Sequence, residues 1–285
     1  MKWFAAFAVS WMWASSSSAF AQTTFDDVHP IYRAHCSDCH STQGNGAFNV
    51  ANRDIATAYA DSPLSSSYAL GQTKGFATLV RIQNGEMPLG AGCSGNPSSD
   101  AGNPACLTAL EQARIQSWIQ GGQLGPRPVV GTTFCFGDGS GTACPCLPGG
   151  ADGGCANTIS FLGGKLVGAG TASVSNDTFV LRATRIPNGP ALFFQGTARV
   201  AGGAGAVFGD GLRCVAGSVV RLGAQTSTGE AAQLPEDSSV SVAARGSISA
   251  SGGTRHYQVW YRNSPAFCQP ETYNLTNGVT VTWTP

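Results

Sequence analysis

The sequence Cys36-Ser37-Asp38-Cys39-His40 places two thiols three positions apart and a histidine directly after the second. This C-x-x-C-H order is typical of a c-type haem attachment site. The thiols can add to the two vinyl groups of one haem, and the histidine can be its proximal iron ligand. A zinc site is disfavoured, because no second C-x-x-C pair completes it and His40 directly follows Cys39. The pattern predicts one covalent haem c on Cys36 and Cys39, with His40 as an axial ligand.

The N-terminal residues have the features of a secretory signal peptide. Lys2 precedes an apolar run, and Ala19-Phe20-Ala21 fits an A-x-A cleavage site. The run is about a dozen residues long, too short to cross a bilayer as a helix. We expect a signal peptide at 1–21 and a mature chain, without a membrane span, in the periplasm or at the cell surface of a bacterium. A retained anchor is the alternative, because the positive region is a single lysine.

The composition favours a β-rich exported protein. Among 285 residues there are 38 glycines and ten cysteines, and only 11% are charged. Two cysteines in the haem motif leave eight, an even number that suits a disulfide set. The 16 basic and 16 acidic residues balance, and no basic block occurs. Nucleic acid and anionic membranes are therefore not expected as partners.

The pattern between residues 22 and 124 is helical. Apolar residues recur at helical spacing before the haem motif, and Thr108 with Glu111 forms a capping-box pattern before an apolar face. Pro30 is tolerated only near a first turn, so the first helix is expected to start between residues 27 and 30. The other helices are expected at 52–59, at 76–83 and after Thr108.

Met87 is the candidate for the second axial ligand. It is the only methionine after the signal segment, and it lies in the loop Asn84-Gly85-Glu86-Met87-Pro88 rather than in a helix or strand. A thioether on such a loop suits a haem iron better than a core-filling role. The competing ligands are His29, His35 and His256. We interpret His29 and His35 as surface or hydrogen-bonded helix residues, and His256 lies far along the chain in the expected β domain.

These residues resemble those of a class I cytochrome c domain. The resemblance rests on the C-x-x-C-H motif, the Met87 loop and the closing Trp118-Ile119-Gln120-Gly121-Gly122. It implies an all-α haem-binding fold for residues 22–124, with Cys36 and Cys39 as thioether links, His40 proximal and Met87 distal. The chain departs from the family in an insert flanked by Cys93 and Cys106, which we expect to form a disulfide.

Residues 125–130 are expected to be a linker, and the pattern of 131–285 is β. Short runs rich in β-branched and aromatic residues are separated by Gly, Asn, Pro and Ser clusters. They predict an antiparallel β-sandwich or jelly-roll with disulfide bonds. The expected strands are 179–184, 191–197, 212–215, 218–224, 238–243, 256–262 and 279–283.

Six cysteines lie in this β region. Cys135, Cys144, Cys146 and Cys155 fall in a stretch almost without apolar residues, where two disulfides are expected and a zinc site is the alternative. Pairing Cys214 with Cys268 would use the other two, although spacing does not fix the connectivity.

The β region also resembles a domain that recurs at the C-termini of large exported bacterial proteins. The similar segments are 137–141, 191–196, 209–214 and 256–262. No activity follows from this resemblance. Asp138 and Asp152 are too sparse for an EF-hand calcium site, and His256 lacks the serine elbow of a hydrolase.

The sequence therefore predicts an exported monohaem c-type cytochrome that carries single electrons between redox partner proteins. The β domain would serve for docking to a partner, a surface or a glycan. One alternative is a haem subunit or peroxidase-like enzyme, which would need an open sixth iron position. The other is a carbohydrate-binding β module with a redox accessory domain.

Overall fold

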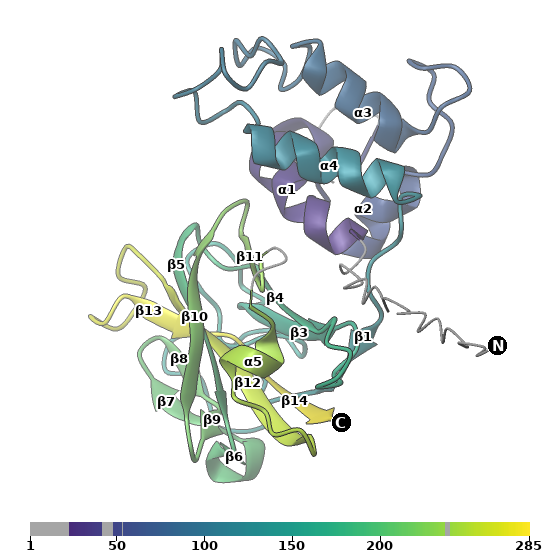
Figure 1. Cartoon of the computed structure of the whole chain (residues 1–285). Coiled ribbons are helices and arrows are strands. Elements are labelled where there is room, and N and C mark those ends of the chain that lie inside the picture. Colours follow the sequence, from purple (N-terminus) through teal and green to yellow (C-terminus); the bar gives the residue numbers. More distant parts are fainter. Residues whose placement is uncertain (1–22, 42–47, 53, 237–239) are drawn as a thin grey trace, which may run out of the picture.

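The structure is a computed structural model that describes residues 23–41, 48–52, 54–236 and 240–285. The expected signal peptide, residues 1–21, lies outside the described residues. In Figure 1 four helices gather at one end of the molecule and the strands form the rest. Among the described residues, no helix is long and apolar enough to cross a membrane.

The four helices begin after a threonine or an aspartate, and at α2, α3 and α4 its side chain accepts from a free backbone N–H group. They are α1 (Phe25–His40), α2 (Ile55–Asp61), α3 (Lys74–Gln83) and α4 (Ala109–Gln120). Thr108 Oγ1 accepts from the Glu111 N–H at 3.3 Å, and the Thr108 N–H donates to Glu111 Oε2 at 2.7 Å. The expected capping box is confirmed. Helix α1 starts earlier than expected, at Phe25, because the Thr24 N–H donates to Asp27 Oδ2 at 2.7 Å.

The apolar faces of these helices meet in one cluster. Trp118 and Phe25 are fully buried at its centre, with ring centroids 5.4 Å apart. The indole N–H of Trp118 donates to the Leu124 carbonyl at 2.9 Å, so its polar atom is satisfied. Burial of such large rings contributes most of the stabilisation that a small helical cluster has. Cys36 and Met87 pack at the margin of this same cluster.

The strands pair antiparallel throughout the named sheets. A four-stranded sheet has the order β1-β3-β4-β11, and a six-stranded sheet has the path β10-β5-β12-β14-β2 with β13 beside β12. Two short ribbons, β6–β9 and β7–β8, complete the region. The strands are β1 (Val129–Val130), β2 (Thr132–Phe134), β3 (Lys165–Ala169), β4 (Val180–Thr184), β5 (Gly189–Gly196), β6 (Ala198–Arg199), β7 (Ala206–Phe208), β8 (Gly211–Arg213), β9 (Val215–Ala216), β10 (Val220–Ser227), β11 (Ala231–Leu234), β12 (Gly253–Arg262), β13 (Tyr273–Leu275) and β14 (Gly278–Trp283).

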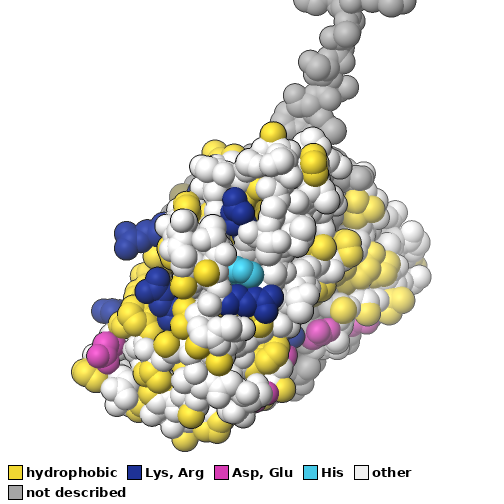
Figure 2. Space-filling model, turned by 90° about the horizontal axis from the view of Figure 1, so that it is seen from below, with side chains coloured by type: hydrophobic (Ala, Val, Ile, Leu, Met, Phe, Trp, Pro, Cys, Tyr) yellow, Lys and Arg dark blue, Asp and Glu magenta, His cyan; other side chains and the backbone are white. Residues whose placement is uncertain are grey.

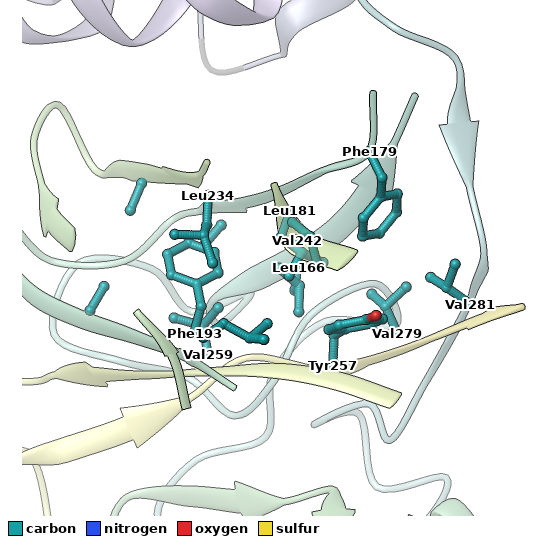
Figure 3. Packing of buried hydrophobic residues seen from close by; sticks show 14 of the residues in the cluster. Leu166, Phe179, Leu181, Phe193, Leu234, Val242, Tyr257, Val259, Val279 and Val281 are labelled. Carbon is teal, nitrogen blue, oxygen red and sulfur yellow. The ribbon is translucent and has the colours of Figure 1, made fainter. Parts of the chain in front are cut away.

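The main hydrophobic core lies between the two larger sheets. Figure 3 shows Leu181 and Leu234 from one sheet facing Tyr257 and Val259 from the other. Alternation along β12 explains this arrangement, because successive side chains of a strand point to opposite faces. Tyr257, Val259 and Tyr261 enter this core, whereas Gln258 bonds to the other face, where its amide donates to the Leu212 carbonyl at 2.8 Å.

One expected strand is a helix instead. Within the described part of 238–243, Ser241 Oγ accepts from the Ala244 N–H at 3.3 Å and caps α5 (Val242–Arg245). A serine that satisfies a backbone donor favours the start of a helix over an extended strand. Val242 and Ala243 are buried in the main core.

Buried ionic contacts join α1 to the four-stranded sheet. Asp26 is fully buried and forms an ion pair with Arg182 on β4. The backbone N–H of Arg127 donates to Asp26 Oδ2 at 2.6 Å. Further along α1, Arg33 donates from Nη2 to the Gly229 carbonyl at 2.7 Å, in the turn between β10 and β11. A Cβ at Gly229 would lie 2.6 Å from the Arg33 carbonyl carbon, so the turn approaches the helix too closely for a side chain.

The expectation of an all-α class I cytochrome c domain followed by a separate β-sandwich or jelly-roll domain is wrong. The described chain is predominantly β, with 14 strands and five short α-helices that form one fold. The resemblances to the cytochrome c family and to the C-terminal β domain do not extend to the fold of this chain, which is β-rich. Local signals located the helices, but they did not reveal that charged residues of α1 are buried against a sheet. Two residues of the expected linker, Val129 and Val130, form β1 and pair with β3.

Candidate functional site

The candidate site begins at the last turn of α1. Cys36, Cys39 and His40 lie at positions i, i+3 and i+4 of this helix, so their side chains share one face. Cys36 is half-buried and Cys39 is exposed. They are the two free thiols among the chain's ten cysteines. Burial raises the pKa of the Cys36 thiol to about 12, so this sulfur is a neutral thiol at the edge of the helical core.

The orientation of His40 is fixed by a backbone carbonyl. Its Nδ1 lies 2.7 Å from the Phe48 oxygen, which can only accept, so Nδ1 carries the proton. The tautomer therefore has its lone pair on Nε2, the nitrogen available to a metal. The Ala51 N–H donates to the His40 carbonyl at 3.0 Å and fixes the backbone at the helix end. A ring held this way matches the outer hydrogen bond that metal-binding histidines usually make.

The Met87 loop is clamped from two sides. The Tyr68 hydroxyl donates to Glu86 Oε1 at 2.6 Å, and Arg81 Nε donates to Glu86 Oε2 at 3.0 Å. These hydrogen bonds hold the pKa of the Glu86 carboxyl below its usual value, and the bond from the Tyr68 hydroxyl has the largest effect. On the other side Gly85 has a φ of 73°, and a Cβ there would lie 2.7 Å from the Cys93 carbonyl oxygen. The half-buried Met87 is thereby held at the helical cluster that Cys36 also touches.

The competing histidines are engaged elsewhere. His29 is buried, its Nε2 lies 2.7 Å from the Asn52 carbonyl, and burial lowers its pKa to about 4. His35 uses both ring nitrogens, with Nδ1 3.1 Å from the Ala105 carbonyl and Nε2 3.1 Å from Glu111 Oε1. His256 lies on β12, where Nδ1 is 2.9 Å from Thr280 Oγ1. All three histidines are therefore held by hydrogen bonds, and Met87 is the remaining candidate for the second axial ligand.

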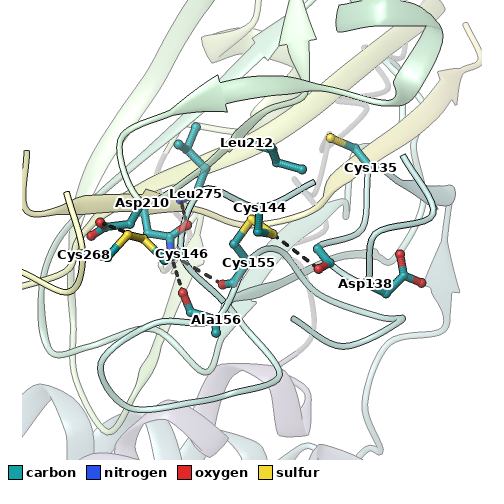
Figure 4. The surroundings of a disulfide bond; sticks show 12 residues. Cys135, Asp138, Cys144, Cys146, Cys155, Ala156, Asp210, Leu212, Cys268 and Leu275 are labelled. Atoms are coloured by element: carbon teal, nitrogen blue, oxygen red, sulfur yellow. Dashed lines mark hydrogen bonds between the residues drawn. A yellow bond between two sulfur atoms is a disulfide. The ribbon is translucent and has the colours of Figure 1, made fainter. Parts of the chain in front are cut away.

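The remaining eight cysteines form four disulfides. Cys93 and Cys106 are bonded, as expected, with Cα atoms 5.6 Å apart. The other bonds are Cys135–Cys214, Cys144–Cys155 and Cys146–Cys268. The expected pairing of Cys214 with Cys268 is wrong. Of the two disulfides expected within the first four cysteines one is present, Cys144–Cys155, and the zinc alternative is wrong because all four cysteines are in disulfides. In Figure 4 the cysteine-rich segment lies beside Leu212 of β8 and beside Cys268. Cys135 and Cys146 therefore have partners far along the chain, whereas Cys144 bonds to the nearby Cys155.

Asp210 lies beside one of these disulfides. It is fully buried, and its Oδ2 accepts from Asn263 Nδ2 at 2.8 Å while its Oδ1 accepts from the Gln269 N–H at 3.0 Å. Among the described residues it forms, with Cys146 and Cys268, the one cluster of potential metal ligands. Because both sulfurs are bonded to each other, neither is a thiolate ligand. Asp210 serves to satisfy backbone and amide donors.

The calcium alternative finds no paired carboxylates. Asp138 Oδ1 accepts from the Ser140 N–H at 2.9 Å and from its hydroxyl at 2.6 Å. Asp152 instead bonds to Lys165 and Arg185, each at 2.8 Å. The two carboxylates thus belong to different networks.

Sequence patterns did not locate the groups that orient the candidate ligands. The Phe48 carbonyl is invisible to motif analysis because any residue supplies one. Tyr68, Arg81 and Glu86 come from different segments of the chain, and only Glu86 belongs to the Met87 loop that the sequence pattern singles out. Comparison with known proteins adds nothing to this assignment: no family model matches the chain, and no curated protein or solved structure is similar to it.

Proposed function

We propose that the protein is an exported one-electron carrier that binds a single haem covalently through Cys36 and Cys39. The observation that carries the proposal is a pair of free thiols on one helix face, in a chain whose remaining eight cysteines are all in disulfides. His40, through Nε2, and Met87, through its sulfur, would be the axial ligands. When bound, the haem supplies reversible one-electron exchange.

The chain's own residues would tune and protect this site. The Phe48 carbonyl orients the His40 ring and makes its Nε2 a stronger donor to a metal. The Glu86 clamp holds the Met87 loop in one position, so the sulfur need not be ordered on binding. The apolar cluster beside Cys36 and Met87 keeps water from one side of the site. A fixed thioether ligand suits electron transfer better than peroxidase chemistry, which needs an open position.

Export is supported by the disulfides. Four disulfides in one chain are typical of an oxidising compartment and are rare in the cytoplasm. Such a compartment is also where redox partner proteins would meet the carrier.

Attachment is tested with two matched pairs of cysteine substitutions. The mature chain is produced in a host that attaches haem to exported proteins, as wild type, as Cys36→Ala/Cys39→Ala and as Cys93→Ala/Cys106→Ala. We expect haem to survive acid-acetone extraction in the wild type and in the second variant, and to be absent from the first. Both pairs lie in the helical region, so loss of haem from both would point to general destabilisation. Retention in the first variant would disprove attachment through these thiols.

The axial assignment is tested with Met87→Ala. Loss of the thioether favours ferric iron, so the reduction potential should fall by about 0.1–0.3 V. Carbon monoxide should then bind rapidly, whereas the wild type should bind it slowly. If the wild type already binds carbon monoxide fast and turns over peroxide, and the substitution changes neither, a peroxidase-like enzyme replaces the carrier.

A further inference from the structure

The face of the β region that points away from the helices is rich in basic side chains. Figure 2 shows Lys and Arg gathered around a histidine on this face, with acidic side chains only toward its rim. The chain has no net charge, since it holds 16 basic and 16 acidic residues. The positive charge here is therefore a local segregation, of the kind that attracts an anionic partner.

Arg199 and His256 share the hydroxyl of Thr280 as a partner, and the Arg199 side chain is held in place from two sides. Its guanidinium lies 4.5 Å from the centroid of the Phe134 ring, and its Nη2 donates to Thr280 Oγ1 at 2.7 Å. His256 Nδ1 is 2.9 Å from the same hydroxyl oxygen. Arg199 nevertheless remains exposed, whereas Phe134 is 7% exposed. A stacked and hydrogen-bonded guanidinium presents its other N–H groups with little entropy left to lose.

Two further arginines share the face without a carboxylate partner. Arg221 on β10 and Gln258 on β12 both pair with Phe194, so the three side chains are on one side of the sheet. Gln258 is two residues from His256 and shares that side, so Arg221 is on the His256 side as well. Arg213 is the last residue of β8, and its Nε donates to the Val215 carbonyl at 3.1 Å. Val215 in turn pairs with Arg199. Among the described residues, none of Arg199, Arg213 and Arg221 takes part in an ion pair.

Threonine hydroxyls lie on the same side of the sheet as His256. Thr254 lies opposite Thr282 with their Oγ1 atoms 3.2 Å apart, and Thr280 lies opposite both His256 and Thr132. By strand register all four threonines are on the His256 side of the sheet. Beside Arg199, a hollow of about 300 Å³ is lined by residues that include Gly141, 201–204 and Ser140, whose hydroxyl donates to Asp138 Oδ1 at 2.6 Å. A Cβ on Gly203 would lie 3.6 Å from Arg199 Cδ, so the hollow borders the guanidinium.

We propose that this arginine–threonine face binds an acidic polysaccharide. Its carboxylates would pair with Arg199, Arg213 and Arg221, and its hydroxyls would exchange hydrogen bonds with the threonines. The hollow is at the small end of ligand pockets, a size that suits one sugar ring. Protein interfaces usually depend on a buried aromatic anchor. The aromatic residue of this cluster, Phe134, is already covered by Arg199, so the chemistry favours a glycan over an acidic protein.

The consequence is a defined placement of the molecule. In Figure 1, β6, which carries Arg199, and α1, which carries Cys36 and Cys39, lie at opposite ends of the molecule. A protein held on an acidic glycan through this face would leave the end of α1 open to a partner. The inference does not depend on haem, because every residue it uses belongs to the β region.

The test is binding of an oligogalacturonate to the mature protein by isothermal titration calorimetry. A neutral malto-oligosaccharide of the same length is the ligand control. We expect binding of the acidic oligosaccharide only, weakening at least tenfold from 50 to 300 mM salt because exposed charges are screened. Equal binding of both sugars, or of neither, would overturn the proposal, and so would tighter binding of single-stranded DNA of equal charge.

Variants locate the site. Arg199→Gln should weaken binding at least tenfold, whereas Arg199→Lys should retain part of the affinity. Arg262→Gln is the matched control. Arg262 is exposed and on the same side of β12 as His256, but it lies six residues further along the strand, so its loss should leave the affinity unchanged. Unchanged thermal unfolding of Arg199→Gln would exclude a folding defect. Wild-type affinity in Arg199→Gln, or equal loss in Arg262→Gln, would contradict the site. Cys36→Ala/Cys39→Ala should bind the glycan normally, so this test fails or succeeds separately from haem attachment.

Discussion

The helical region and the sheet region treat their cysteines differently. The sheet region bonds all six of its cysteines, whereas the helical region bonds Cys93 to Cys106 and leaves Cys36 and Cys39 free. The free pair lies on one helix face beside an oriented histidine, where a disulfide would have been the simplest use of two thiols. The sheet region thus uses every cysteine for a cross-link, whereas the helical region leaves two thiols free, and we propose that these two bind haem.

The first test of this contrast removes one disulfide from each region. Cys135→Ala/Cys214→Ala opens a separation of 79 residues and Cys93→Ala/Cys106→Ala one of 13. In the chain-entropy model these closures are worth about 4.5 and about 3 kcal/mol of unfolding free energy. Chemical denaturation should therefore show a larger loss for the first variant. Equal losses, or none, would mean that the sheet region does not depend on its long-range bonds.

The second test addresses the buried charge that joins the regions. Asp26→Asn leaves Arg182 buried without its counter-ion and should cost about 3–5 kcal/mol of unfolding free energy. Asp152→Asn, at a half-exposed carboxylate, is the matched control and should cost less than about 1 kcal/mol. Denaturation midpoints measure both. If the two substitutions cost the same, α1 is not anchored to the sheet through Asp26.

Acid should weaken the helical region through His29. Burial lowers its pKa from 6.5 to about 4. Between these two pH values the imidazole is protonated in the unfolded chain and neutral in the folded chain. The unfolding free energy should fall by about 3 kcal/mol as the pH falls through this window. His29→Gln should flatten the slope. The pKa of His35 is raised instead, by its contact with Glu111 against the effect of burial, so its contribution is lost as the pH rises. A slope unchanged in His29→Gln would exclude His29 as the cause.

Helix caps should give the smallest effects and a direct comparison of the regions. Thr108→Ala removes the cap of α4, and Ser241→Ala removes the cap of α5. Each should cost about 1 kcal/mol of unfolding free energy, with Thr108→Ala the larger because Glu111 also bonds to the Thr108 N–H. Thermal unfolding with Thr108→Ser as the conservative control checks this. A larger cost at Ser241 would show that α5 matters more to the sheet core than its length suggests.

Local chemistry explains which features the sequence could predict. The capping box of Thr108 and the bond between Cys93 and Cys106 depend on residues near each other in the chain, and both are present. The burial of Asp26 against Arg182 joins residues from a helix and a distant strand, and no local pattern records it. The disulfide connectivity depends on how the cysteine-rich segment crosses β8, which spacing alone does not encode. These long-range contacts overturned the two-domain cytochrome expectation.

The candidate site divides in the same way. The motif residues Cys36, Cys39 and His40 were identifiable because their order itself carries the chemistry. The Phe48 carbonyl and the Tyr68 hydroxyl were not, because their roles arise only when separate segments meet.

The most direct test of the central claim is the mass of the intact, denatured protein, measured without reductant after treatment with a thiol-alkylating reagent. The protein is produced in a host that attaches haem to exported proteins. We expect one haem retained on the polypeptide, four disulfides and no alkylated thiol. A chain without haem, alkylated at Cys36 and Cys39, would contradict it.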